Sequence, residues 1–120
     1  MTIRVLCFIV VVLLIGGCTT PAELRQKGPI LEQKSLRAAK NLAACIAEGW
    51  ENAGVYMAQV NMRIATGGYT VAIRGESSTP MLADITDAPS GGSLTSLYSV
   101  IFNSAQERKF SEVVIRCQKD

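Results

Sequence analysis

The stretch YMAQVNMRIATGGYTVAIR, Tyr56–Arg74, sets the fold class, because its apolar and polar residues alternate on both sides of a glycine pair. Residues 56–64 place apolar side chains at every second position, which is the period of a half-buried strand. Thr66-Gly67-Gly68 is typical of a hairpin turn, since glycine adopts the positive φ that such turns need. Residues 69–74 alternate again and predict a partner strand. The first strand should turn these residues toward the core: Tyr56, Ala58, Val60, Met62 and Ile64.

Two further strands are predicted after this hairpin. A loop at Glu76–Pro80 precedes a short alternating segment, residues 81–86, and a turn at Asp87–Gly92 leads into a fourth strand, Leu94–Phe102. The third strand has three residues that should face inward: Met81, Ala83 and Ile85. The fourth strand has four apolar residues on one face, Leu94, Tyr98, Val100 and Phe102, and a pattern blurred by Leu97 and Ile101.

Helical periodicity is found on both sides of these strands. Apolar residues recur at three-four spacing from about Glu32 to Trp50, which predicts an amphipathic helix with Cys45 on its buried stripe. A last helix is predicted to begin at Ser104. Its apolar residues follow the i, i+3, i+4, i+7 spacing: Phe110, Val113, Val114 and Cys117. Both cysteines are therefore expected to face inward.

The first residues of the chain are typical of a secretory signal. Arg4 precedes Val5–Ile15, eleven residues without a charge, and small residues follow. This run is too short for a membrane-spanning helix, which needs ~20 apolar residues. A short basic region, an apolar region and a small-residue cleavage site is the layout of a removable signal peptide. The alternative is an uncleaved anchor in which Cys18 is an ordinary thiol.

Ile15-Gly16-Gly17-Cys18 resembles the lipobox of bacterial lipoproteins, with Ile and Gly where Leu and Ala or Ser are commonest. The resemblance implies that residues 1–17 are removed and that Cys18 is acylated, with palmitate among its chains. Acyl chains bind a membrane stably when more than one is present. Thr19 after the cysteine, rather than Asp, implies the periplasmic face of the outer membrane. The resemblance thus implies a signal peptide over 1–17, a lipidated cysteine and tether over 18–30, and a periplasmic domain over 31–120.

Composition limits the partners of the mature chain. Loss of Arg4 with the signal leaves 11 Lys and Arg against 10 Asp and Glu, and the chain contains no histidine. This near-neutral balance argues against a nucleic-acid partner, and the sequence contains no basic run of the kind that binds anionic lipid. The expected partners are the membrane, through acylated Cys18, and another envelope protein. No cofactor is expected.

The cysteine count predicts one disulfide. If Cys18 is lipidated, Cys45 and Cys117 remain in an exported protein, whose compartment permits disulfides. A bridge between them would be worth about 4 kcal/mol in the chain-entropy model. Two free buried thiols are the alternative. A metal site is not expected, because two cysteines without histidine offer too few ligands for zinc.

Strands gathered between two helices favour an α+β domain. The prediction is a four-stranded antiparallel sheet, with the N-terminal and C-terminal helices packed on one face and joined by the disulfide. Trp50 and Tyr56, at the corner between the first helix and the first strand, are expected in the core rather than on a recognition patch.

Catalytic patterns are weak in this sequence, and we expect no enzyme activity. Without histidine, the commonest triad and most metal sites are excluded. Glu48 and Glu51 are interpreted as solvated helix surface, and Asp84 and Asp87 as residues flanking a turn.

The whole pattern looks like the small outer-membrane lipoproteins of proteobacteria, which have a lipobox signal and a two-cysteine periplasmic domain. The resemblance rests on the helix with Ala-Ala-Cys-Ile-Ala-Glu-Gly-Trp and on the final Val-Ile-Arg-Cys. It implies a lipid-anchored, non-enzymatic accessory or interaction module of the envelope. The alternative is a pilotin-like or carrier lipoprotein with an open apolar cleft for a lipid or peptide. A lysozyme-inhibitor-like protein, faintly suggested by Ser90–Ser93, and a hydrolase are remote alternatives.

Overall fold

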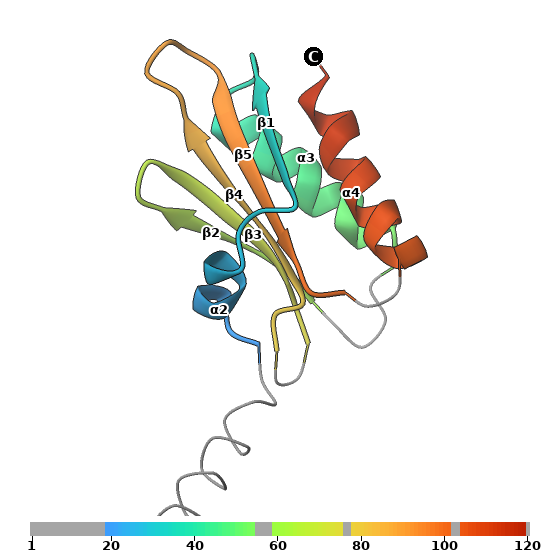
Figure 1. Ribbon diagram of the computed structural model, residues 1–120. Helices are drawn as coiled ribbons and strands as arrows, with labels where there is room; N and C mark the ends of the chain where they lie inside the picture. The colour runs from blue at the N-terminus through green and yellow to red at the C-terminus, as the bar shows by residue number, and fades with distance from the viewer. Residues whose placement is uncertain (1–18, 55–58, 76–77, 102–103, 120) are drawn as a thin grey trace, which may run out of the picture.

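The computed structural model describes residues 19–54, 59–75, 78–101 and 104–119. They form an α+β domain around one antiparallel sheet (Figure 1). In chain order the elements are α2 (Pro21–Gln26), β1 (Leu31–Ser35), α3 (Ala39–Asn52), β2 (Gln59–Ala65), β3 (Gly68–Arg74), β4 (Met81–Asp87), β5 (Ser93–Ser99) and α4 (Ser104–Gln118). The signal segment, Cys18, Tyr56 and Phe102 lie outside the described residues.

The sheet has five strands in the order β1-β5-β4-β3-β2, so the prediction of four was wrong. Strands β2 to β5 are joined in sequence as a meander, as expected, and β1 adds to the free edge of β5. Leu31 of β1 lies opposite Leu97, and Ser35 lies opposite Ser93. The α+β class and the antiparallel pairing are confirmed.

The predicted helix over Glu32–Trp50 was wrong in its first turns. Residues 31–35 are a strand whose side chains alternate between half-buried and exposed, but only Leu31 among them is apolar. The two-residue period of this strand therefore cannot be detected from its hydrophobic residues. Helix α3 begins at Ala39, and its N-cap, Ala38, makes no side-chain cap. The carboxylate of Asp87 accepts the Ala39 N–H at 3.1 Å instead, so a turn distant in sequence caps the helix.

The main core lies between one face of the sheet and helices α3 and α4, which run side by side (Figure 1). Both helices contribute their predicted apolar stripes, and β3 to β5 contribute the inward residues Val71, Ile73, Met81, Ala83, Ile85 and Leu97. Trp50 is fully buried, as expected. Its indole N–H donates to the carbonyl oxygen of Phe110 at 3.0 Å, and the two rings meet edge to face.

The disulfide between Cys45 and Cys117 is confirmed, which excludes the alternative of two free thiols. It joins the middle of α3 to the last turn of α4, with 5.9 Å between the two Cα atoms. Cys117 is buried and Cys45 is half-buried at the rim of the main core.

Helix α2 covers part of the opposite face of the sheet (Figure 1). The stretch expected to be a tether therefore includes an ordered element. Leu24 is 1% exposed and packs with Ala72 and Leu82, and Tyr98 and Val100 border this second cluster. The inward face predicted for the fourth strand was accordingly wrong. Leu97 faces the main core, whereas Tyr98 and Val100 face α2, so β5 is apolar on both faces.

The hairpin between β2 and β3 forms at the predicted turn. Gly67 has φ +76°, and a side chain at Gly68 would collide with the carbonyl group of Ile85 on β4. The inward face predicted for β2 is only partly correct. Val60 packs against the main core, but Met62 is 46% exposed and Ile64 is 85% exposed. These two residues lie on an edge strand, toward its hairpin end.

Candidate binding groove

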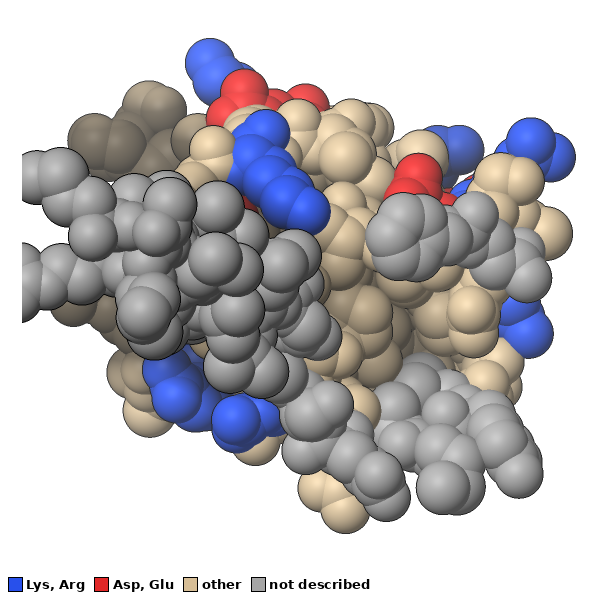
Figure 2. All heavy atoms as spheres, turned by 60° about the horizontal axis from the view of Figure 1, so that its bottom comes forward, with Lys and Arg blue, Asp and Glu red and all other residues tan. Residues whose placement is uncertain are grey.

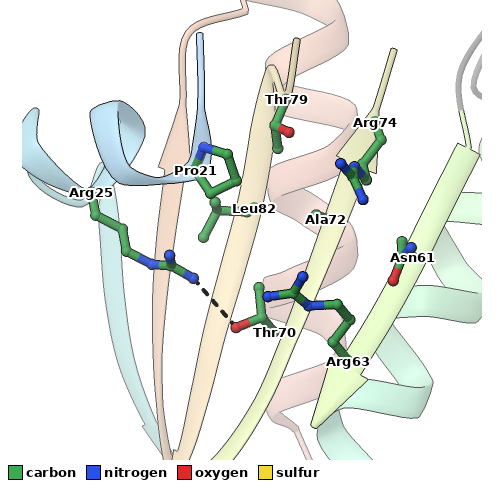
Figure 3. A pocket seen from close by; sticks show the side chains of 9 residues that line it. All are labelled: Pro21, Arg25, Asn61, Arg63, Thr70, Ala72, Arg74, Thr79 and Leu82. Carbon is green, nitrogen blue, oxygen red and sulfur yellow. Dashed lines mark hydrogen bonds between the residues drawn. The ribbon is translucent and has the colours of Figure 1, made fainter. Parts of the chain in front are cut away.

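A groove lies beside α2 on the sheet face that carries the second cluster (Figure 3). It contains about 390 Å³ of space, part of which is open to solvent. One side is formed by α2 and the floor by β2, β3 and β4. We call it the arginine groove, and nine residues line it: Pro21, Arg25, Asn61, Arg63, Thr70, Ala72, Arg74, Thr79 and Leu82.

Strand alternation places the polar side chains on this face. Val71 and Ile73 point into the main core, so Thr70, Ala72 and Arg74 of the same strand point the other way. In the neighbouring strand, Arg63 lies opposite Thr70 and Asn61 lies opposite Ala72. Because Ala72 has a short side chain, the groove is deeper between Arg63 of β2 and Arg74 of β3.

Arg25 is fixed at the α2 side of the groove by an ion pair with Asp84. Its Nε donates to one carboxylate oxygen at 2.8 Å, and its terminal nitrogen donates to the other at 2.9 Å. The hydroxyl of Thr70 also donates to the carboxylate of Asp84, at 2.8 Å. This bidentate arrangement ties α2 to β4 and leaves Arg25 oriented along the groove.

The network shifts the pKa values of both charged partners. The hydrogen bond to Asp84 raises the pKa of Arg25, against a smaller opposing effect of burial. For Asp84, burial raises the pKa, but the hydrogen bonds from Arg25 and Thr70 and the Arg25 charge together outweigh it, so the pKa is lowered. Asp84 is therefore ionised at neutral pH and compensates one positive charge.

Arg63 and Arg74 differ from Arg25, because neither forms a hydrogen bond or an ion pair with an acid among the described residues. Both side chains are exposed. Figure 3 shows their guanidinium groups on either side of Ala72, with Arg25 reaching in from α2 opposite. Among the described residues, the groove thus brings together three guanidinium groups and one compensating carboxylate. Its surplus of positive charge makes it suited to an anionic ligand.

One end of the arginine groove, at Pro21 and Thr79, lies beside the first described residues of the chain. The N–H of Thr79, a buried residue of the lining, donates to the carbonyl oxygen of Thr19 at 2.9 Å. The hydroxyl of Thr20 caps α2 by accepting the N–H of Glu23 at 3.2 Å, and Pro21 opens the helix. The first described residues are therefore hydrogen-bonded to the fold. Figure 2 looks toward this end and shows basic side chains on several sides of it.

The acids considered from the sequence are not brought together. Glu48 and Glu51 are exposed on α3, behind the other sheet face. Asp84 is held by Arg25, and Asp87 caps α3. Within the described ranges, no group of three His, Cys, Asp or Glu residues is placed to hold a metal ion.

Sequence reasoning did not find the arginine groove. The outward orientation of Arg63 and Arg74 follows from the alternation of residues 56–64 and 69–74, but alternation alone gives no reason to group them with Arg25. That grouping depends on α2, which is only six residues long and has one buried residue, Leu24. A helix this short leaves little periodicity in a sequence.

No family model matches this chain, and neither does any curated protein sequence or solved structure. Among the residues that the structure describes, no helix is long and apolar enough to cross a membrane.

Proposed function

We propose that this protein is a lipid-anchored, non-enzymatic module of the cell envelope, and that it acts by binding an anionic group in the arginine groove. Its anchor would be acylated Cys18 on the periplasmic face of the outer membrane. The observation that carries the proposal is the pair Arg63 and Arg74, which face an open groove and have no acidic partner among the described residues.

The contacts that the acidic residues make support a binding role over catalysis. A hydrolase needs a nucleophile or an activated water next to a base. The two acids of β4 serve structural contacts: Asp84 holds Arg25 on the groove face, and Asp87 caps α3 on the opposite face. The described lining of the groove is cationic and contains no free base, so it can hold an anion but offers it no general-base chemistry.

The carrier alternative receives less support from the packing. It predicts an open apolar cleft between the sheet and its two long helices. Fifteen buried hydrophobic residues fill that space among the described residues, with the Trp50 and Phe110 rings in contact. The arginine groove lies instead beside α2, and six of its nine lining residues are polar or charged.

A photo-crosslinking experiment tests the proposed function in membranes. A photoreactive residue would replace Asn61 inside the groove, and in a control chain Lys40, which is exposed on α3. We expect a discrete adduct from position 61 that is lost when Arg63→Gln and Arg74→Gln are added. Equal labelling from positions 61 and 40, or an adduct that survives the arginine changes, would disprove a binding role for the groove.

A further inference from the structure

We infer that the arginine groove binds a phosphate group, and that its source is the headgroup of an anionic phospholipid in the membrane that holds Cys18. This inference rests on the proposed function, since it needs the lipid anchor. It adds the chemical class of the ligand and the orientation of the domain on the membrane.

The first step concerns the distance between anchor and groove. The Thr19 carbonyl accepts a hydrogen bond from Thr79, which lines the groove. Cys18 is the next residue, and consecutive Cα atoms are about 3.8 Å apart. Helix α2 begins at Pro21, which also lines the groove. Only one or two residues of chain would therefore separate an acylated Cys18 from the residues that line the groove.

The second step concerns depth. The polar headgroup layer on each side of a bilayer is roughly 5–7 Å thick beyond the hydrocarbon core. An acylated cysteine places its chains in the core and its backbone in this layer. Because Thr19 and Pro21 are part of the folded domain, the end of the domain that carries Arg74 and Thr79 would lie against the headgroups. Phosphates are the anions present at that depth.

The third step concerns chemistry. A guanidinium group offers planar paired donors that match two oxygens of a phosphate, and it is more weakly hydrated than an ammonium group. Arg63 and Arg74 come from neighbouring strands, and their guanidinium groups lie on either side of Ala72, with Arg25 opposite. Among the described residues, the carboxylate that binds Arg25 is that of Asp84, and it also accepts a hydrogen bond from Thr70. A phosphate can thus enter without facing a free negative charge from the described residues.

The competing occupant is a carboxylate of another envelope protein. Such a partner would have to reach the end of the domain that the anchor holds against the membrane. The position of the groove therefore favours a lipid phosphate, and an acidic peptide becomes one arm of the test.

The experiment uses the full chain, purified from membranes into a neutral detergent, and follows its melting temperature. Four probes are titrated at constant ionic strength: dihexanoyl phosphatidylglycerol, dihexanoyl phosphatidylcholine, inorganic phosphate and an acetylated hexaglutamate peptide. Ligand that binds the folded state raises the melting temperature by mass action. We expect phosphatidylglycerol to raise it by about 6–11 °C at tenfold excess over Kd, and more than the other probes do.

Matched variants assign the effect to the groove. The double variant Arg63→Gln, Arg74→Gln should abolish the shift, whereas Arg108→Gln, on the exposed side of α4, should keep it. Arg63→Lys with Arg74→Lys keeps the charge but loses the paired donors, so the affinity should fall on the order of tenfold.

Three outcomes would overturn the inference. No shift with any probe would show that the groove binds no such anion. A shift with inorganic phosphate but none with phosphatidylglycerol would place the ligand in solution rather than in the membrane. A hexaglutamate shift as large as that of phosphatidylglycerol would indicate a protein carboxylate. The intact mass of the same sample reports acylation of Cys18 separately, so a failure of the anchor is distinguishable from a failure of the groove.

Discussion

The two faces of the sheet differ in how they are covered. Helices α3 and α4 close one face, where fifteen described residues of the helices and the strands form the main core and a disulfide joins the two helices. Among the described residues, the other face carries the six residues of α2, a second cluster around Leu24, and the arginine groove beside it. The first arrangement favours stability, and the second leaves polar side chains accessible.

The two differently covered faces separate the residues proposed to bind from the residues that form the main core. A chain of this size buries a modest fraction of its surface and has little stability to spare. Here the residues proposed to bind lie on the face that contributes less to the core. Changes on the closed face should therefore alter stability, and changes in the groove should alter binding.

Removing the disulfide should give the largest effect. Cys45 and Cys117 are separated by 72 positions, for which the chain-entropy model gives about 4 kcal/mol. We expect Cys45→Ser and Cys117→Ser to lower the free energy of unfolding by similar amounts, measured by urea denaturation. Unequal losses would indicate that one cysteine contributes mainly through packing.

A matched pair of leucines compares the two faces directly. Leu42 of α3 and Leu24 of α2 are 0% and 1% exposed. Leu42→Ala should cost about 3 kcal/mol of global stability, within the usual range for buried leucine. Leu24→Ala should cost about 2 kcal/mol, because a six-residue helix can detach locally.

Hydrogen exchange distinguishes local detachment of α2 from global destabilisation. In Leu24→Ala the amides of α2 should exchange faster while those of α3 keep their protection. If Leu24→Ala instead destabilises both helices as much as Leu42→Ala does, the two faces are not independent.

The cap of α3 should have a smaller effect. Asp87→Ala removes the acceptor for the Ala39 N–H and should lower the free energy of unfolding by about 1 kcal/mol. Asp87→Asn keeps an oxygen acceptor and should cost less. Thermal denaturation of the two variants side by side measures the difference, and equal losses would point to charge rather than to the hydrogen bond.

The ion pair on the groove side should have the smallest effect, and it should depend on pH. Asp84→Asn should cost about 0.5 kcal/mol at neutral pH, because the Arg25–Asp84 pair is partly exposed. The folded state lowers the pKa of Asp84, so its contribution is present above the unfolded value of about 3.9 and is lost as pH falls through the folded value. The stability curves of wild type and variant should converge below about pH 4. A constant gap down to pH 2 would contradict this role.

The closed face was largely predictable from the sequence, and the groove face was not. The stripe with Phe110 and Cys117, the alternation of β3 and β4, and the cysteine pairing all leave a periodic or countable signal. Strand β1 leaves none, because its inward residues Gln33 and Ser35 are polar. Only tertiary contact reveals α2, and its presence explains why β5 carries apolar residues on both faces.

One measurement tests both the proposed lipid anchor and the disulfide. It is the intact mass of the full chain taken from membranes, before and after reduction and thiol alkylation. We expect a mass that begins at Cys18 and includes acyl chains, with two alkylated thiols that appear only after reduction. A mass that begins at Met1, with Cys18 unmodified, would remove the reason for placing the arginine groove at a membrane surface.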